Sequence, residues 1–93
     1  MATKFRDFLN EQLKDEDFRR EYEALELERT IIQALIDARE TSSITREELS
    51  ARTGIPKSVI SKIENASFSP SIRTLKRLAD GIGMKLKLEL QPA

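Results

Sequence analysis

Four polar side chains lie close together in the sequence at a spacing that suits contact with DNA. Lys57, Ser58, Ser61 and Lys62 follow Pro56, and in a helix they would share one outward face. Lys donates well to the O6 and N7 atoms of guanine, and a Ser hydroxyl can contact either kind of base edge. These four residues are therefore our candidates for contact with DNA.

Catalytic chemistry is not indicated. Carboxylates are abundant, as in residues 15–17 and 47–48, but the chain has no His and no Cys. The commonest general base and the usual metal ligands are therefore missing, and we see no Gly-rich phosphate loop or nucleophile elbow. We expect no enzymatic activity, no catalytic or metal-binding residue and no cofactor. Solvated helix surfaces account for the carboxylates.

The elements that would position these four residues are two short helices joined by a tight turn. Thr45 and Glu48 have the spacing of a capping box, which starts a helix at residue 45. Gly54 tolerates the positive φ that ends a helix sharply, and Pro56 suits the start of the next one. The inward positions of that second helix are apolar: Val59, Ile60 and Ile63. The pattern predicts a helix-turn-helix, although an ordinary helical hairpin would share many of these features.

Charge is divided unevenly along the chain. The 16 basic and 16 acidic residues cancel overall. Residues 1–40 hold 7 basic and 11 acidic residues, a net charge of −4, whereas residues 41–93 hold 9 and 5, a net charge of +4. The second half thus has the charge expected for phosphate contact. The first half should avoid DNA and suits a basic partner.

Helical spacing extends on both sides of the motif. We expect one helix from about Thr3 to Asp15 and a second apolar stripe that runs into a helix from Leu27 to Arg39. A last helix from about residue 71 to Asp80 should be stopped by glycines 81 and 83. We divide the chain into an N-terminal helical extension (1–26), a DNA-binding domain (27–83) and a C-terminal strand and tail (84–93). With no long apolar run, a cytoplasmic location without a membrane partner is the default expectation.

The C-terminal segment has a different period. Residues 84–90 alternate strictly between apolar and charged side chains, which is typical of a half-buried strand. A single strand is unstable, so it must pair with a second copy of the chain, a partner protein or a strand that the sequence does not reveal. We expect a homodimer. The candidate dimerisation residues are Met84, Leu86, Leu88 and Leu90. A solvated tail is the alternative.

Residues 31–83 resemble the Xre/Cro family of five-helix phage-type repressors. The resemblance rests on residues 38–39, 44–50, 53–55, 58–65 and 70–75. The N-terminal extension and the C-terminal strand resemble antitoxins of the HigA-like class, which come from type II toxin–antitoxin operons. The resemblance therefore implies an all-α, five-helix phage-repressor-like helix-turn-helix core with an N-terminal helical extension and a short C-terminal β-strand.

The resemblance also implies roles for single residues. Arg46 stands where the family usually has a phosphate-contacting Gln, and Pro56 stands where it usually has a capping Ser or Thr. Arg39 and Glu64 match a structural ion pair that holds the second helix of the motif. The family's base-contacting positions are the four residues named above. Its phosphate contacts correspond to Arg46, Asn65, Ser67 and Ser69.

Two functions fit these observations. The first is an antitoxin that represses its own operon and neutralises a toxin, which the resemblance implies is a small basic ribonuclease acting on mRNA at the ribosome. A toxin–antitoxin heterotetramer is compatible with this function. The second is a stand-alone phage-type transcription regulator. The extension distinguishes the two, because a plain repressor can begin near residue 27. Its large apolar groups could pack back on the core or bind a toxin, and we expect some of them to do each. The candidate toxin-binding residues are Phe5, Phe8, Leu9, Phe18 and Tyr22.

Overall fold

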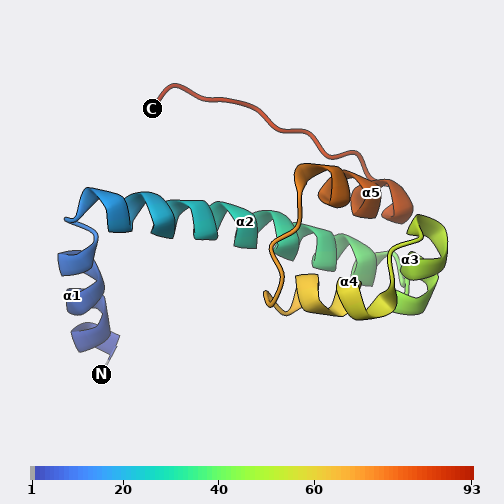
Figure 1. The fold of residues 1–93 in the computed structure, drawn as a ribbon, viewed down its shortest axis with the longest axis horizontal. Coiled ribbons are helices and arrows are strands. Elements are labelled where there is room, and N and C mark those ends of the chain that lie inside the picture. Colours follow the sequence, from blue (N-terminus) through green and yellow to red (C-terminus); the bar gives the residue numbers. More distant parts are fainter. Residues whose placement is uncertain (1) are drawn as a thin grey trace. The chain divides into compact units, whose positions relative to one another are not determined.

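Five helices make up the computed structural model, which describes residues 2–93. They are α1 (Ala2–Gln12), α2 (Glu16–Thr41), α3 (Arg46–Thr53), α4 (Lys57–Glu64) and α5 (Ile72–Ile82), and they are labelled in Figure 1. The chain forms two compact units, residues 1–30 and 31–93, with the boundary inside α2. None of the helices between residues 2 and 93 has the length and apolar content needed to cross a membrane.

The hydrophobic core lies in the second unit. Here α3, α4 and α5 group around the C-terminal part of α2 (Figure 1). Every buried hydrophobic residue that the structure describes belongs to this unit: Ile32, Ile44, Leu49, Ile55, Ile60, Ile63, Leu75, Leu78, Ala79 and Ile82. The core is therefore formed by α3, α4, α5 and the C-terminal part of α2, and the all-helical fold with five helices in residues 2–93 agrees with the expected fold class.

The turn between α3 and α4 forms as the sequence predicts. The Thr45 hydroxyl accepts a hydrogen bond from the Glu48 backbone N–H at 3.1 Å, so Thr45 caps α3. Gly54 ends α3 in the left-handed region with φ of 75°. Pro56 precedes the first residue of α4, and its carbonyl accepts from the N–H groups of Val59 and Ile60. The buried Ile55 lies between the two helices in sequence and belongs to the core.

Helix α5 shows that one prediction was wrong. Ser71 caps its first turn through a bond from the Thr74 N–H, and Gly83 ends it with φ of 87°. Gly81 does not stop the helix but lies inside it. A Cβ at Gly81 would come within 2.5 Å of Thr53 Cγ2 and 2.9 Å of Leu49 Cδ1. The glycine is therefore needed for the close approach of α5 to α3.

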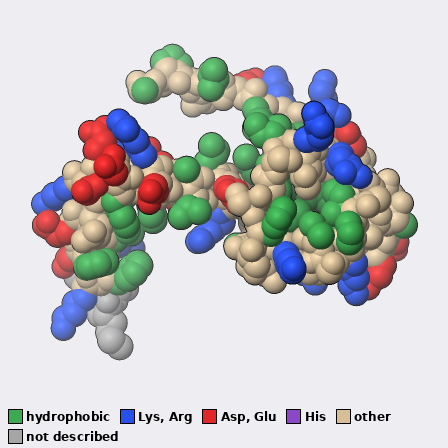
Figure 2. All heavy atoms as spheres, in the orientation of Figure 1, with side chains coloured by type: hydrophobic (Ala, Val, Ile, Leu, Met, Phe, Trp, Pro, Cys, Tyr) green, Lys and Arg blue, Asp and Glu red, His purple; other side chains and the backbone are tan. Residues whose placement is uncertain are grey.

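The first unit is built from α1 and the N-terminal part of α2. Asp15 begins α2 by accepting a hydrogen bond from the Phe18 N–H at 3.0 Å. The second apolar stripe does run into the longer helix, since α2 is continuous for 26 residues. No residue from 4 to 30 is buried. Figure 2 shows hydrophobic side chains gathered on this part of the molecule.

The predicted C-terminal strand is not found. The structure has no strand anywhere in residues 2–93, and residues 84–93 continue from α5 as an irregular segment. The physical reason is that a strand needs a neighbour for its backbone N–H and C=O groups, and all other regular structure described in this one chain is helical. The alternating pattern still has an effect, because Leu86 packs against the core.

Candidate nucleic-acid interface

Helix α4 divides into an apolar inner face and a polar outer face. Ile60 and Ile63 are each about 1% exposed and belong to the core cluster, so they fix the helix against the core of this unit. The four candidate base-contacting residues lie away from that core. Lys57, Ser58 and Lys62 are exposed and Ser61 is half-buried. The helix thus presents two cations and two hydroxyls along one side, as the spacing predicted.

Lys57 is paired with a carboxylate of the preceding helix. Its ammonium lies 2.5 Å from Glu47 Oε1, and both side chains are more than half exposed. The pKa of the Glu47 carboxyl lies below its ordinary value, chiefly because Lys57 donates a hydrogen bond to it. Sequence reasoning missed this pair, since the two residues are ten positions apart and meet only through the turn.

Glu64 joins three helices. Arg39 of α2 donates to both of its oxygens, with Nε–Oε2 at 2.8 Å and Nη2–Oε1 at 3.0 Å. Arg46 of α3 donates through Nε to Oε1 at 2.7 Å. Arg39 also donates to the Ile44 carbonyl at 2.9 Å. The structure therefore brings Arg39 and Glu64 together, and it adds Arg46 to them, a contact that the sequence did not indicate.

The ionisation of Glu64 is set by opposing effects. Burial by itself would raise the pKa of this carboxyl, since its side chain is only 9% exposed. The hydrogen bonds from Arg39 and Arg46 outweigh that effect and hold the pKa below its ordinary value. The hydrogen bond between Arg39 and Glu64 also raises the pKa of Arg39. Glu64 is thus a charged anchor that fixes α4 against α2 and α3.

The loop after α4 holds the other candidate phosphate contacts. Asn65 is the C-cap residue of α4, and its Oδ1 accepts a hydrogen bond from the Ser67 N–H at 3.0 Å. Ala66 takes a left-handed conformation with φ of 64°, which turns the chain. Asn65, Ser67 and Ser69 are all exposed. They follow directly on α4, so the proposed phosphate contacts adjoin the proposed base contacts in sequence.

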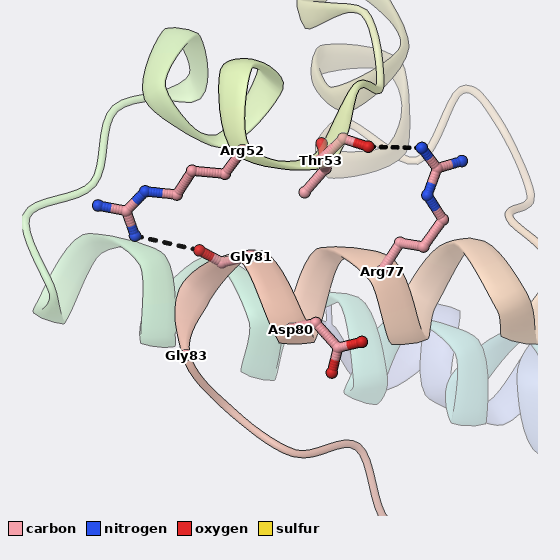
Figure 3. Close-up of a pocket in the computed structure, with 6 residues that line it drawn as sticks. All are labelled: Arg52, Thr53, Arg77, Asp80, Gly81 and Gly83. Carbon is pink, nitrogen blue, oxygen red and sulfur yellow. Dashed lines mark hydrogen bonds between the residues drawn. The ribbon is translucent and has the colours of Figure 1, made fainter.

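A second pair of arginines lies between the C-terminal ends of α3 and α5. Arg52, Thr53, Arg77, Asp80, Gly81 and Gly83 line a hollow of about 460 Å³ (Figure 3). Arg52 Nη1 donates to the Gly81 carbonyl at 3.1 Å, and Arg77 Nη2 donates to the Thr53 carbonyl. Each guanidinium thus satisfies the exposed carbonyls at the end of the other helix. The sequence did not single out these residues, whose first role here is to join α3 to α5.

The candidate toxin-binding and dimerisation residues differ in how exposed their side chains are. Phe5 and Phe8 of α1 are 68% and 62% exposed, whereas Leu9, Phe18 and Tyr22 are half-buried. The rings of Phe18 and Tyr22 stack with centroids 6.4 Å apart. Of the candidate dimerisation residues, Leu86 is half-buried, and Met84, Leu88 and Leu90 are exposed.

Comparison with protein families shows that residues 35–88 match the model of the HTH_3 family, described as helix-turn-helix. The matched region contains α3, α4 and α5 and covers more than half of the 93 residues. Comparison with curated proteins and with solved structures gives no significant match. The family assignment agrees with the capped turn and the polar face of α4. The chain therefore belongs to the HTH_3 helix-turn-helix family of DNA-binding regulators.

Proposed function

We propose that this chain is an antitoxin that represses its own operon through α4 and neutralises a cognate toxin through its N-terminal extension. The observation that carries the proposal is the division into two units. One has a buried core and a family-typical DNA-binding motif, and the other has exposed aromatic side chains and no buried residue among residues 4–30. A regulator that only binds DNA has no need of the second.

DNA recognition is assigned to the outer face of α4. Lys57, Ser58, Ser61 and Lys62 contact base edges in the major groove. Arg46, Asn65, Ser67 and Ser69 contact phosphates and set the position of the helix. Arg39 and Glu64 take no part in reading the bases. They hold α4 at a fixed angle, so that contacts made at its N-terminal end are reproducible.

The chain acts on DNA as a homodimer that pairs through residues 84–90. Antiparallel pairing with Leu88 opposite its own copy places Leu86 opposite Leu90 and Lys87 opposite Glu89 of the second chain. All of these cross-strand pairs are then apolar with apolar or cation with anion, which is the favourable arrangement. A second copy is therefore a well-matched neighbour for this segment, and such a dimer presents two α4 helices to two half-sites.

The toxin is assigned to the extension. Phe5 and Phe8 offer large exposed aromatic surface, and exposed apolar patches of this kind mark binding sites. The net charge of −4 over residues 1–40 favours a basic partner by steering its approach. A small basic ribonuclease has the complementary charge. Docking there would use no residue of α4, and we expect the complex still to bind the operator.

A stand-alone transcription regulator is the second candidate. It is favoured by the observation that residues 31–93 contain the whole buried core, so DNA binding needs nothing from the extension. In that case the aromatic residues of α1 would meet no toxin. The two functions predict different outcomes when the extension is removed.

The test is a deletion of residues 1–25, expressed together with the protein encoded beside it. We expect the deleted chain to bind the DNA upstream of its gene and to lose the ability to neutralise that protein. Full neutralisation by the deleted chain would contradict the placement of the toxin site.

A second truncation tests the dimer. Removal of residues 84–93 should weaken dimerisation and operator binding together, as measured by sedimentation and by titration with DNA. An unchanged dimer with unchanged operator affinity would rule out pairing through this segment.

A further inference from the structure

Two cations on the DNA-binding surface are each paired with a carboxylate, but the two pairs are built differently. Arg46 is paired with Glu64, and Lys57 is paired with Glu47. The first carboxylate is 9% exposed and also binds Arg39. The second is 64% exposed. The first pair is therefore anchored in the fold, whereas the second lies in solvent.

The Arg46 pair leaves the cation able to bind phosphate. Among the residues that the structure describes, Glu64 is the partner of the Arg46 guanidinium, and the bond runs through Nε. A guanidinium carries five N–H donors in a fixed fork, so the two Nη atoms retain four of them. The side chain is 45% exposed. Glu64 thus orients Arg46 without occupying the donors that a phosphate needs.

The Lys57 pair has the opposite effect. An ammonium is a compact point charge without a separate second face, and Glu47 already lies against it at 2.5 Å. A phosphate that approaches Lys57 must come close to the Glu47 carboxylate and is repelled by it. Against the DNA backbone the pair has no net charge. Counterion release from a single phosphate contact at Lys57 is therefore largely cancelled.

From these contacts we infer that Glu47 is a specificity-determining residue, which keeps Lys57 from binding DNA backbone indiscriminately and lets it engage where a base offers suitable acceptors. Guanine presents O6 and N7 side by side in the major groove, and neither atom carries the full charge that the carboxylate repels. Specificity then arises from weakened binding to the wrong sites as much as from contacts to the right one. This inference rests on the proposed base contact of Lys57.

The experiment compares Glu47→Gln with Glu48→Gln in the full chain. Both changes remove one negative charge from α3. Glu48 is a matched control because its carboxylate lies near Arg52, at 4.0 Å, and not near Lys57. Gln also serves at that position of a capping box. Affinity is measured by titration against the operator and against random duplex DNA over a series of salt concentrations.

We expect Glu47→Gln to tighten binding to random DNA by about fivefold at low salt, with a salt slope steeper by about one unit. Operator affinity should change less, so the ratio of specific to random affinity falls. Glu48→Gln should leave that ratio unchanged. In a Lys57→Ala background the effect of Glu47→Gln should largely disappear. An equal change on both DNAs, no change on either, or persistence of the effect without Lys57 would overturn the inference.

A different result is expected if the proposed base contact of Lys57 is itself wrong. If Lys57→Ala alone weakens operator and random DNA equally, Lys57 contacts phosphate and the proposed site assignment fails. If Lys57→Ala alone reduces operator affinity selectively while Glu47→Gln changes nothing, the base contact stands and the role of Glu47 is refuted.

Discussion

Residues 31–93 and residues 4–30 both contain many apolar side chains, but every buried one that the structure describes lies in the first of these regions. In the first region Leu49, Ile60 and Ile63 are at most 2% exposed, and polar groups at the surface are held by helix caps and by Glu64. In the second region Phe5, Phe8 and Leu25 are each more than 60% exposed. The buried residues of the first region build a scaffold for α4. The exposed side chains of the second are available for contact with another molecule.

The largest expected effect is on the free energy of unfolding, and it appears when the same Leu→Ala substitution is made once in each region. Leu49→Ala should destabilise the chain by about 2–5 kcal/mol, because it empties a fully buried position. Leu25→Ala should change the free energy of unfolding by less than about 0.5 kcal/mol, because that side chain is 61% exposed. Urea unfolding measures both. A large loss for Leu25→Ala would show that the extension has a core of its own.

The next effect concerns the anchor of α4. Glu64→Gln should cost about 1.5–3 kcal/mol at neutral pH, because it replaces charged hydrogen bonds to Arg39 and Arg46. The folded pKa of Glu64 lies below its ordinary value of 4.5. Its contribution is therefore complete above pH 4.5 and is lost as the pH falls through the folded pKa. Unfolding titrations should thus converge for wild type and Glu64→Gln in acid. A difference that stays constant with pH would contradict this.

A smaller effect on stability is expected from Gly81→Ala, which tests the contact of α3 with α5. Whether this substitution stabilises or destabilises the chain is informative. Helix propensity alone predicts that Gly81→Ala stabilises α5 by about 1 kcal/mol. The added Cβ would lie 2.5 Å from Thr53 Cγ2, so α3 and α5 would have to separate. This contact predicts the reverse, a loss of stability of about 1–3 kcal/mol. Thermal unfolding decides between them, and a raised melting temperature would show that the contact relaxes cheaply.

Sequence patterns predicted the parts of this molecule that depend on near neighbours. The cap at Thr45 and the left-handed turn at Gly54 are local, and both are present as expected. The role of Gly81 and the pairs formed by Arg46 and Lys57 depend on how helices meet, and no short-range pattern encodes them. Residues 84–90 have the period of a strand, but a period cannot supply the neighbour that a strand requires.

Substitutions of the proposed DNA-contacting residues should differ in their effects on binding. Lys57→Ala should cost about 1–3 kcal/mol on the operator and relax base preference. Arg46→Ala should weaken binding to all sequences and lower the salt slope by about one unit. Titrations against operator and random DNA distinguish the two. If Arg46→Ala proves selective for the operator, Arg46 belongs with the base-reading residues.

The most direct test of the division between the two regions is one double variant, Phe5→Ser with Phe8→Ser, measured against both partners. These side chains are exposed, so the fold and the operator dissociation constant should be unchanged, while neutralisation of the proposed toxin is lost. Retained neutralisation at full strength, or an equal loss of operator binding, would contradict the assignment of separate tasks to residues 1–30 and 31–93.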